Sequence, residues 1–275
     1  MLDNLRAIQP SLNSQALLQG QSTQSISQGN AQSTQQGVQN PHATDSFEGI
    51  KSATKMLSKE EALALREEII AISKEHTTNT KSIKDVRARI EPKLEKLENY
   101  FAANRPENEV ELTRGVWKSV WYDDPDIGDR GPLKLNRERI WQVVRDGYYY
   151  NVSDSDVRLG KLKLGRLSNY LKGAYSISNT PTPENKGEKR LNVINLEFVY
   201  NGMRLGGLPE GKPVNTMVDK VENSCFGSVK IPGPYGVKGE LWNIYVDDKV
   251  RISAGFNKEN PEVLDLYILE KGDKI

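Results

Sequence analysis

The spacing of hydrophobic residues changes from a helical to a strand period near residue 110. Before that point apolar residues recur at intervals of three and four, which is typical of amphipathic helices. Ser58 and Glu61 have the spacing of a capping box, so a first helix is expected to begin there. A second helical pattern runs from Ile83 to Phe101, and Pro92 inside it predicts a kink or a restart.

After residue 110, apolar and polar residues alternate in short segments separated by Gly, Pro, Asn and Asp, as in antiparallel strands and their turns. The segments "RIWQVV" and "GYYYNV" predict a hairpin that turns at Arg145 and Asp146. Eight or so such strands predict a mainly β fold, either an antiparallel barrel or a sandwich. The segment 201–239 is rich in Gly and Pro, and we expect a long loop there that covers one end.

The beginning of the chain differs in composition from the rest. Gln, Ser, Asn and Thr dominate residues 1–45, and such a segment buries too little apolar surface to offset its ordering entropy. We therefore expect a disordered leader over 1–57, a helical segment packed on the barrel over 58–109, and the barrel domain over 110–275. The leader is either a solvated tail or a docking or sorting segment, and both readings stay open.

The charges of the chain nearly cancel, since 38 Lys and Arg oppose 37 Asp and Glu. This balance supplies no large field for attracting nucleic acid, so no nucleic-acid partner is expected. His42 and His76 are the only histidines and Cys225 is the only cysteine, which argues against a zinc site or a Cys–His nucleophile. The sequence also shows no phosphate loop and no nucleophile–base constellation. We therefore expect no enzyme, no metal and no cofactor.

Two motifs resemble those of a known family. Gly115-Val116-Trp117 is similar to the G-x-W signature of lipocalins. Residues 229–255, "VKIPGPYGVKGELWNIYVDDKVRISAG", resemble the closing section of the plastid-lipid-associated proteins, or fibrillins. In that family an "IP" segment leads to a Y-[LV]-D-[ED]-x-[LV]-R-I-S strand and a glycine. The resemblance covers roughly residues 58–271, and it departs from the family at Ala254, where a second arginine is usual.

The resemblance implies a lipocalin-like barrel that binds or sequesters a hydrophobic small molecule, such as a lipid, a carotenoid or a quinone. It also implies peripheral association with a membrane or a lipid body, in a plastid or on a photosynthetic membrane. The leader is not a typical transit peptide, so the address does not follow from the family. In lipocalin-like barrels an arginine of the last strands packs over the G-x-W tryptophan, which assigns Trp117 and Arg251 as a barrel-closing stack.

Four further residues are candidates for binding the ligand. Strict alternation places Trp121 on the same strand face as Trp117, nearer the middle or the mouth of the barrel. Alternation can also turn inward Phe198, Trp242 and Ile244. These side chains predict either a ligand pocket or an ordinary packed core. The rival function is a structural or scaffold protein with a filled barrel, which acts through its helices or its N-terminal tail.

Overall fold

The computed structural model describes residues 56–75, 80–123, 133–179, 191–223, 229–231 and 236–275. Nearly all of the leader expected over 1–57 lies outside these residues, as do His42, His76 and Cys225. The predictions made for them therefore stay predictions.

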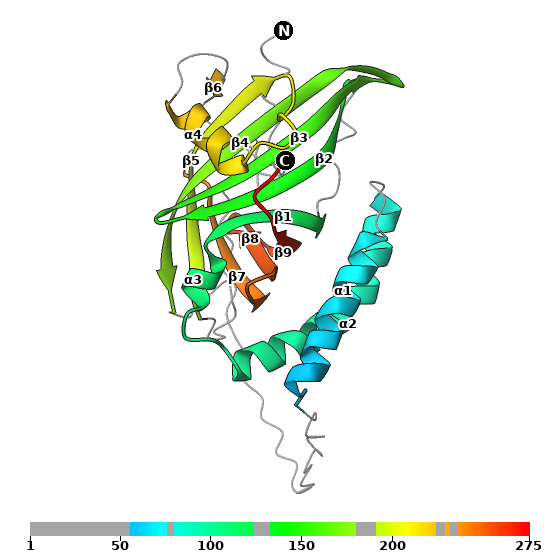
Figure 1. Ribbon diagram of the computed structural model, residues 1–275, viewed down its shortest axis with the longest axis vertical. Coiled ribbons are helices and arrows are strands. Elements are labelled where there is room, and N and C mark those ends of the chain that lie inside the picture. Colours follow the sequence, from blue (N-terminus) through cyan, green and yellow to red (C-terminus); the bar gives the residue numbers. More distant parts are fainter. Residues whose placement is uncertain (1–55, 76–79, 124–132, 180–190, 224–228, 232–235) are drawn as a thin grey trace, which may run out of the picture.

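Eight antiparallel strands close into a barrel (Figure 1). They are β1 (Gly115–Tyr122), β2 (Leu133–Arg145), β3 (Tyr148–Leu159), β4 (Leu162–Ser178), β5 (Val193–Leu205), β7 (Lys238–Val246), β8 (Val250–Asn257) and β9 (Asn260–Lys271). Each strand pairs with the next one in this order, and β9 pairs with β1 to complete the ring. The short strand β6 (Val229–Ile231) pairs with β5 beyond the end of β7. The predicted mainly β fold with an antiparallel barrel is confirmed.

Both predicted helices are present ahead of the barrel. α1 (Lys59–Lys74) begins where the capping box places it, because the Ser58 side chain accepts from the Glu61 N–H while the Glu61 carboxylate accepts from the Ser58 N–H. α2 (Thr80–Ala103) continues through Pro92, so the helix does not restart there. Pro92 lacks the N–H that would bond one turn back, which weakens the helix locally and favours a bend.

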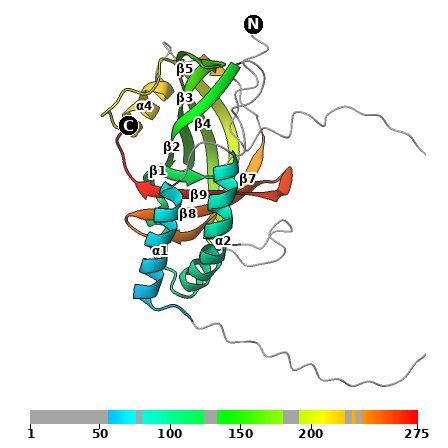
Figure 2. The same cartoon turned by 90° about the vertical axis from the view of Figure 1, so that its right-hand side faces the viewer.

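The helices α1 and α2 form a layer on the outer face of β1, β9, β8 and β7 (Figure 2). Their apolar sides belong to one buried cluster with outward-facing residues of these strands. The rings of Phe101 on α2 and Tyr245 on β7 lie 5.6 Å apart, centroid to centroid. Each large apolar side chain buried in this way contributes about 1.5–3 kcal/mol, so the layer is a substantial part of the core.

The segment 201–239 differs from the long loop we expected. β5 continues to Leu205, and α4 (Val214–Asn223) follows. The residues buried on one face of α4 have helical spacing: Val214, Met217, Val218 and Val221. They pack with Trp141, Tyr150 and Tyr170 on the outer face of β2, β3 and β4. α4 therefore covers a side of the barrel and not an end.

Candidate functional site

One hydrogen bond shows which faces of the strands line the interior of the barrel. The Arg251 guanidinium on β8 donates to the Gln142 side-chain oxygen on β2 at 3.1 Å. Two strands, β9 and β1, lie between β8 and β2 in the sheet. Side chains from these strands can meet only across the barrel, so both residues face the interior. Alternation and strand pairing then assign the inner face of every other strand.

A short helix closes one end of the barrel with polar side chains. α3 (Glu109–Thr113) brings the fully buried Glu109 to Asn243 of β7, whose amide donates to the Glu109 carboxylate and to the Thr113 hydroxyl, each at 2.8 Å. The Asn243 side-chain oxygen in turn accepts from Arg251 Nε at 2.8 Å. We call this end of the barrel the capped end. The hydrogen-bonded side chains there form the capped-end cluster, which consists of Glu109, Thr113, Asn243, Arg251 and Gln142. It joins a buried carboxylate to a buried guanidinium through one amide.

Two more groups stabilise the Glu109 carboxylate. Arg105 forms an ion pair with it at 2.6 Å, and Asn192 donates to it at the same distance. Asn192 has φ 54°, a left-handed conformation that asparagine tolerates better than most residues. It occurs where the chain enters β5, and it brings the amide toward α3.

The buried guanidinium of Arg251 is the least expected part of this cluster. Burial lowers the pKa of Arg251 from its ordinary value to about 10, since taking the cation out of water disfavours it. Burial likewise raises the pKa of the Tyr149 hydroxyl on the same inner face. Among the described residues, one guanidinium nitrogen of Arg251 and the Gln142 amide nitrogen have no hydrogen-bond partner. The cluster therefore fills the capped end with polar side chains, and two of its hydrogen-bond donors have no acceptor.

Trp117 lies fully buried on the inner face at the capped end, as expected. Its indole N–H donates to the Thr113 carbonyl at 2.8 Å, which ties β1 to α3. The cation over its ring is Lys271, with Nζ 4.0 Å from the ring centroid, and not the predicted Arg251. Lys271 occupies this place because it is the direct cross-strand partner of Trp117 on β9. The guanidinium of Arg251 makes its hydrogen bonds to Asn243 and Gln142 instead.

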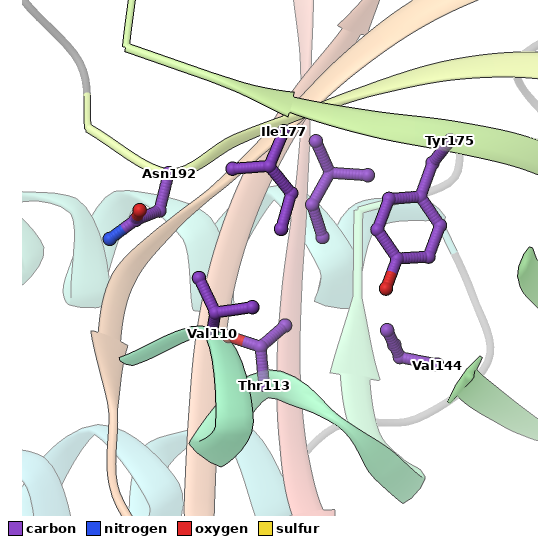
Figure 3. Close-up of a pocket in the computed structure, with 7 residues that line it drawn as sticks. Val110, Thr113, Val144, Tyr175, Ile177 and Asn192 are labelled. Atoms are coloured by element: carbon purple, nitrogen blue, oxygen red, sulfur yellow. The ribbon is translucent and has the colours of Figure 1, made fainter. Parts of the chain in front are cut away.

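A small pocket lies beside the cluster, between α3 and the ends of β2, β4 and β5 (Figure 3). Its lining is mostly apolar: Val110, Thr113, Val144, Tyr175, Ile177, Asn192 and Ile194. The volume is about 10 Å³, which suits one water molecule. Sites for small organic ligands are much larger, about 300–1,000 Å³, so this pocket does not hold such a ligand as it stands.

The placement of Trp121 on the inner face is corrected by the structure. The pairing of β1 with β9 shifts between Ser119 and Trp121, so Val120 is the extra residue of a β-bulge. Ser119 pairs with Leu269, and Trp121 pairs with its neighbour Ile268. The bulge turns Trp121 to the outer face, where it is buried in the cluster that contains the helix layer.

The other three predicted ligand residues are also separated. Trp242 pairs with Ala254, on the face opposite Arg251, and therefore lies outward beneath the helix layer. Ile244 is the extra residue of a second bulge, in the pairing of β7 with β8, and belongs to the same cluster. Phe198 alone of the four faces the interior, since it pairs with Gly173, which pairs with the inward Tyr149. The four do not form one site.

The inner wall farther from α3 has a different character. The end of the barrel opposite α3 contains the β3–β4 turn and the end of β5, and we call it the distal end. Its wall carries two small apolar clusters, Val157 with Leu167 and Met203, and Leu171 with Phe198 and Val237. Between them, among the described residues, the side-chain oxygens of Asn169 and Asn201 are buried without a hydrogen-bond partner. The period-two pattern of β4 and β5 could have indicated these residues, but only the closed barrel shows that they share a wall.

Comparison of the chain with models of protein families, with curated proteins and with solved structures finds no match in any of the three. The resemblance to plastid-lipid-associated proteins therefore rests on its motifs alone. Within the described ranges, no group of three or more His, Cys, Asp or Glu residues is arranged to hold a metal ion. No helix in the same ranges has the length and apolar character needed to cross a membrane.

Proposed function

We propose that the barrel binds one hydrophobic small molecule, such as a lipid, a carotenoid or a quinone, in its distal half. A barrel of eight strands has an interior of the width that holds one small ligand. The capped end is occupied by its own polar cluster, so the ligand takes the part lined by Leu167, Leu171, Phe198 and Met203.

The observation that carries this proposal is the pair of unpartnered amide oxygens in that wall. Leaving a buried acceptor without a donor costs about 1–3 kcal/mol. A ligand with a hydroxyl or an N–H group satisfies Asn169 or Asn201 while its apolar body covers the leucines. Apolar walls with a few placed polar groups are typical of sites for small hydrophobic ligands. Among hydrophobic molecules, those with a hydrogen-bond donor are therefore favoured over pure hydrocarbons.

Native mass spectrometry of the gently purified full chain, followed by organic extraction, tests this proposal. A stoichiometric apolar adduct is expected. Met203→Trp should block its uptake, because the larger side chain fills the distal interior. Met56→Trp, the same change at an exposed position before α1, is the matched control and should leave uptake unchanged. Circular dichroism of both variants checks that they are folded, since overpacking costs about 1–3 kcal/mol.

The alternative is a structural protein whose barrel is filled, and the packed capped end with its water-sized pocket favours it. A bare mass after incubation with lipids, carotenoids and quinones would support this alternative. The helices and the tail would then be the segments to test for a partner. An adduct that survives Met203→Trp unchanged would refute the distal site while leaving another binding place in the chain open to search.

A further inference from the structure

Leucine side chains are exposed at the distal end of the barrel. At the β3–β4 turn, Leu159 is 47% exposed, Leu162 is 63% exposed and Leu164 is 53% exposed, and Leu205 at the end of β5 is 85% exposed. We call these four residues the distal leucine edge. A group of exposed apolar side chains at one end of a molecule marks an interaction surface.

The same turn is strongly basic. Residues 158–166 read "RLGKLKLGR" and contain four cations and no carboxylate, although the whole chain is nearly neutral. Lys161 and Lys163 are exposed beside the leucines. The nearby Asp154 and Asp156 are buried and already paired, with Arg166 at 2.8 Å and with Lys163 at 2.7 Å. Arg158 also pairs with Asp156, so three of the four cations lie in these ion pairs. Four cations still face two carboxylates, and the edge therefore presents apolar side chains beside a net positive charge of two.

The register of the hairpin separates the two kinds of side chain. Leu159 and Leu162 are direct partners on one face, while Arg158 and Lys163 are partners on the other. The turn lies at the opposite end of the barrel from α3, where β3 and β4 extend upward in Figure 1. A projecting end of this kind can enter the headgroup region of a lipid bilayer.

We propose that the distal leucine edge docks the protein on an anionic lipid bilayer. The leucines enter the boundary between headgroups and acyl chains, and the basic residues lie over the anionic headgroups, as in interfacial amphipathic segments. The charge and the apolar residues favour a membrane over a nucleic acid, because residues 158–166 contain no aromatic ring for stacking on bases. This docking does not depend on the ligand, but it would bring the ligand-binding half of the barrel to the membrane.

Vesicle sedimentation with the full chain tests this proposal. The chain should bind vesicles of phosphatidylcholine mixed with phosphatidylglycerol and bind weakly to phosphatidylcholine alone, with the difference lost in high salt. Each unit of charge near an anionic surface changes partitioning onto the vesicles about fivefold. Lys161→Glu changes the charge by two units, so it should lower partitioning about 25-fold. Lys249→Glu is the matched control, an exposed lysine at the capped end, and should change partitioning by less than about twofold.

The apolar part is tested by the double variant Leu162→Ser and Leu164→Ser, with Ile177→Ser at the capped end as control. We expect about a tenfold loss of binding for the first and little change for the second. Equal binding to neutral and anionic vesicles, equal effects of Lys161→Glu and Lys249→Glu, or binding of single-stranded RNA without vesicles would each overturn the proposal.

The proposal can fail separately from the proposed ligand site. Met203→Trp should still bind anionic vesicles even when it no longer takes up a ligand. Loss of vesicle binding in Lys161→Glu with normal ligand uptake supports an independent docking edge. A wild-type chain that takes up ligand but ignores anionic vesicles overturns docking and leaves the ligand site standing.

Discussion

Glu109 and Arg251 place a carboxyl group and a guanidinium group in the interior of the protein. Both side chains are fully buried, and Asn243 connects them by donating to one and accepting from the other. Removing charged groups from water is costly, and the cost is offset only when each has close partners. Glu109 has such partners in Arg105, Asn192 and Asn243, so its carboxylate is a main connection between α3 and the barrel.

Glu109→Ala should lower the free energy of unfolding by about 3 kcal/mol, because it leaves Asn243 and Asn192 without their acceptor and Arg105 without its counter-charge. Glu111→Ala is the matched control on the same helix, since Glu111 is exposed and its pair with Arg114 is at the surface. Its effect should be within about 1 kcal/mol of zero. Urea unfolding of both variants measures the difference, and equal effects would contradict the role given to Glu109.

One β-bulge in β1 decides which face of the barrel wall carries Trp121. Strict alternation predicts Trp117 and Trp121 on one face, and the bulge at Val120 puts them on opposite faces. Trp121 then lies in a row with Ile268, Ile252 and Tyr245 on the outer face, beneath the helix layer. The function of Trp121 therefore changes from a candidate ligand contact to an anchor for the helices.

Trp121→Ala should lower the free energy of unfolding by about 3–5 kcal/mol, the usual cost of removing a buried tryptophan. Ligand uptake per folded molecule should not change, because the side chain faces away from the interior. Tyr148→Ala, an exposed aromatic on β3, is the control for unfolding. If Trp121→Ala weakened uptake without affecting stability, the inward placement from simple alternation would have to be restored.

At the scale of the whole molecule, charged pairs connect the helix layer to the barrel. Arg66 on α1 pairs with Asp247 after β7, Arg87 on α2 pairs with Asp123 after β1, and Lys74 pairs with Glu270 on β9. Burial acts against the Asp247 carboxylate, but hydrogen bonds from the Lys249 and Val250 N–H groups, from Tyr245 and the Arg66 charge together lower its pKa.

This lowered pKa sets a pH dependence. The pKa of this carboxyl group is lower in the folded protein than in the unfolded chain. Its ionised form therefore adds fully to the free energy of unfolding above about pH 4, and this contribution is lost as the pH falls through the pKa of the folded protein. Asp247→Asn should therefore lower stability by about 2 kcal/mol at neutral pH and have a smaller effect in acid. Thermal unfolding across the acidic range measures this. Glu270→Gln is the control, because its pair with Lys74 is exposed and contributes little.

Much of the fold could be predicted from the chain alone. The capping box at Ser58 and Glu61 marks the start of α1, and the turn after Arg145 separates β2 from β3. These features depend on neighbouring residues, so their signals are local. α4 was missed because a single short amphipathic helix, between segments rich in Gly and Pro, is a weak signal even though its buried face has helical spacing.

The period of the apolar residues was enough to predict antiparallel strands behind two helices, because it decides which faces can be buried, but it left a barrel and a sandwich both open. Which side chains share the interior depends on the strand register of the closed barrel, and local sequence does not show that register. A one-residue bulge reverses every face that follows it, so Trp121 left the predicted site. Trp242 lies outward because of its register with Ala254, and Phe198 faces the interior through its pairing with Gly173. The hydrogen bond between Glu109 and Asn243 joins residues 134 positions apart, and a contact of that kind exists only once the barrel has closed.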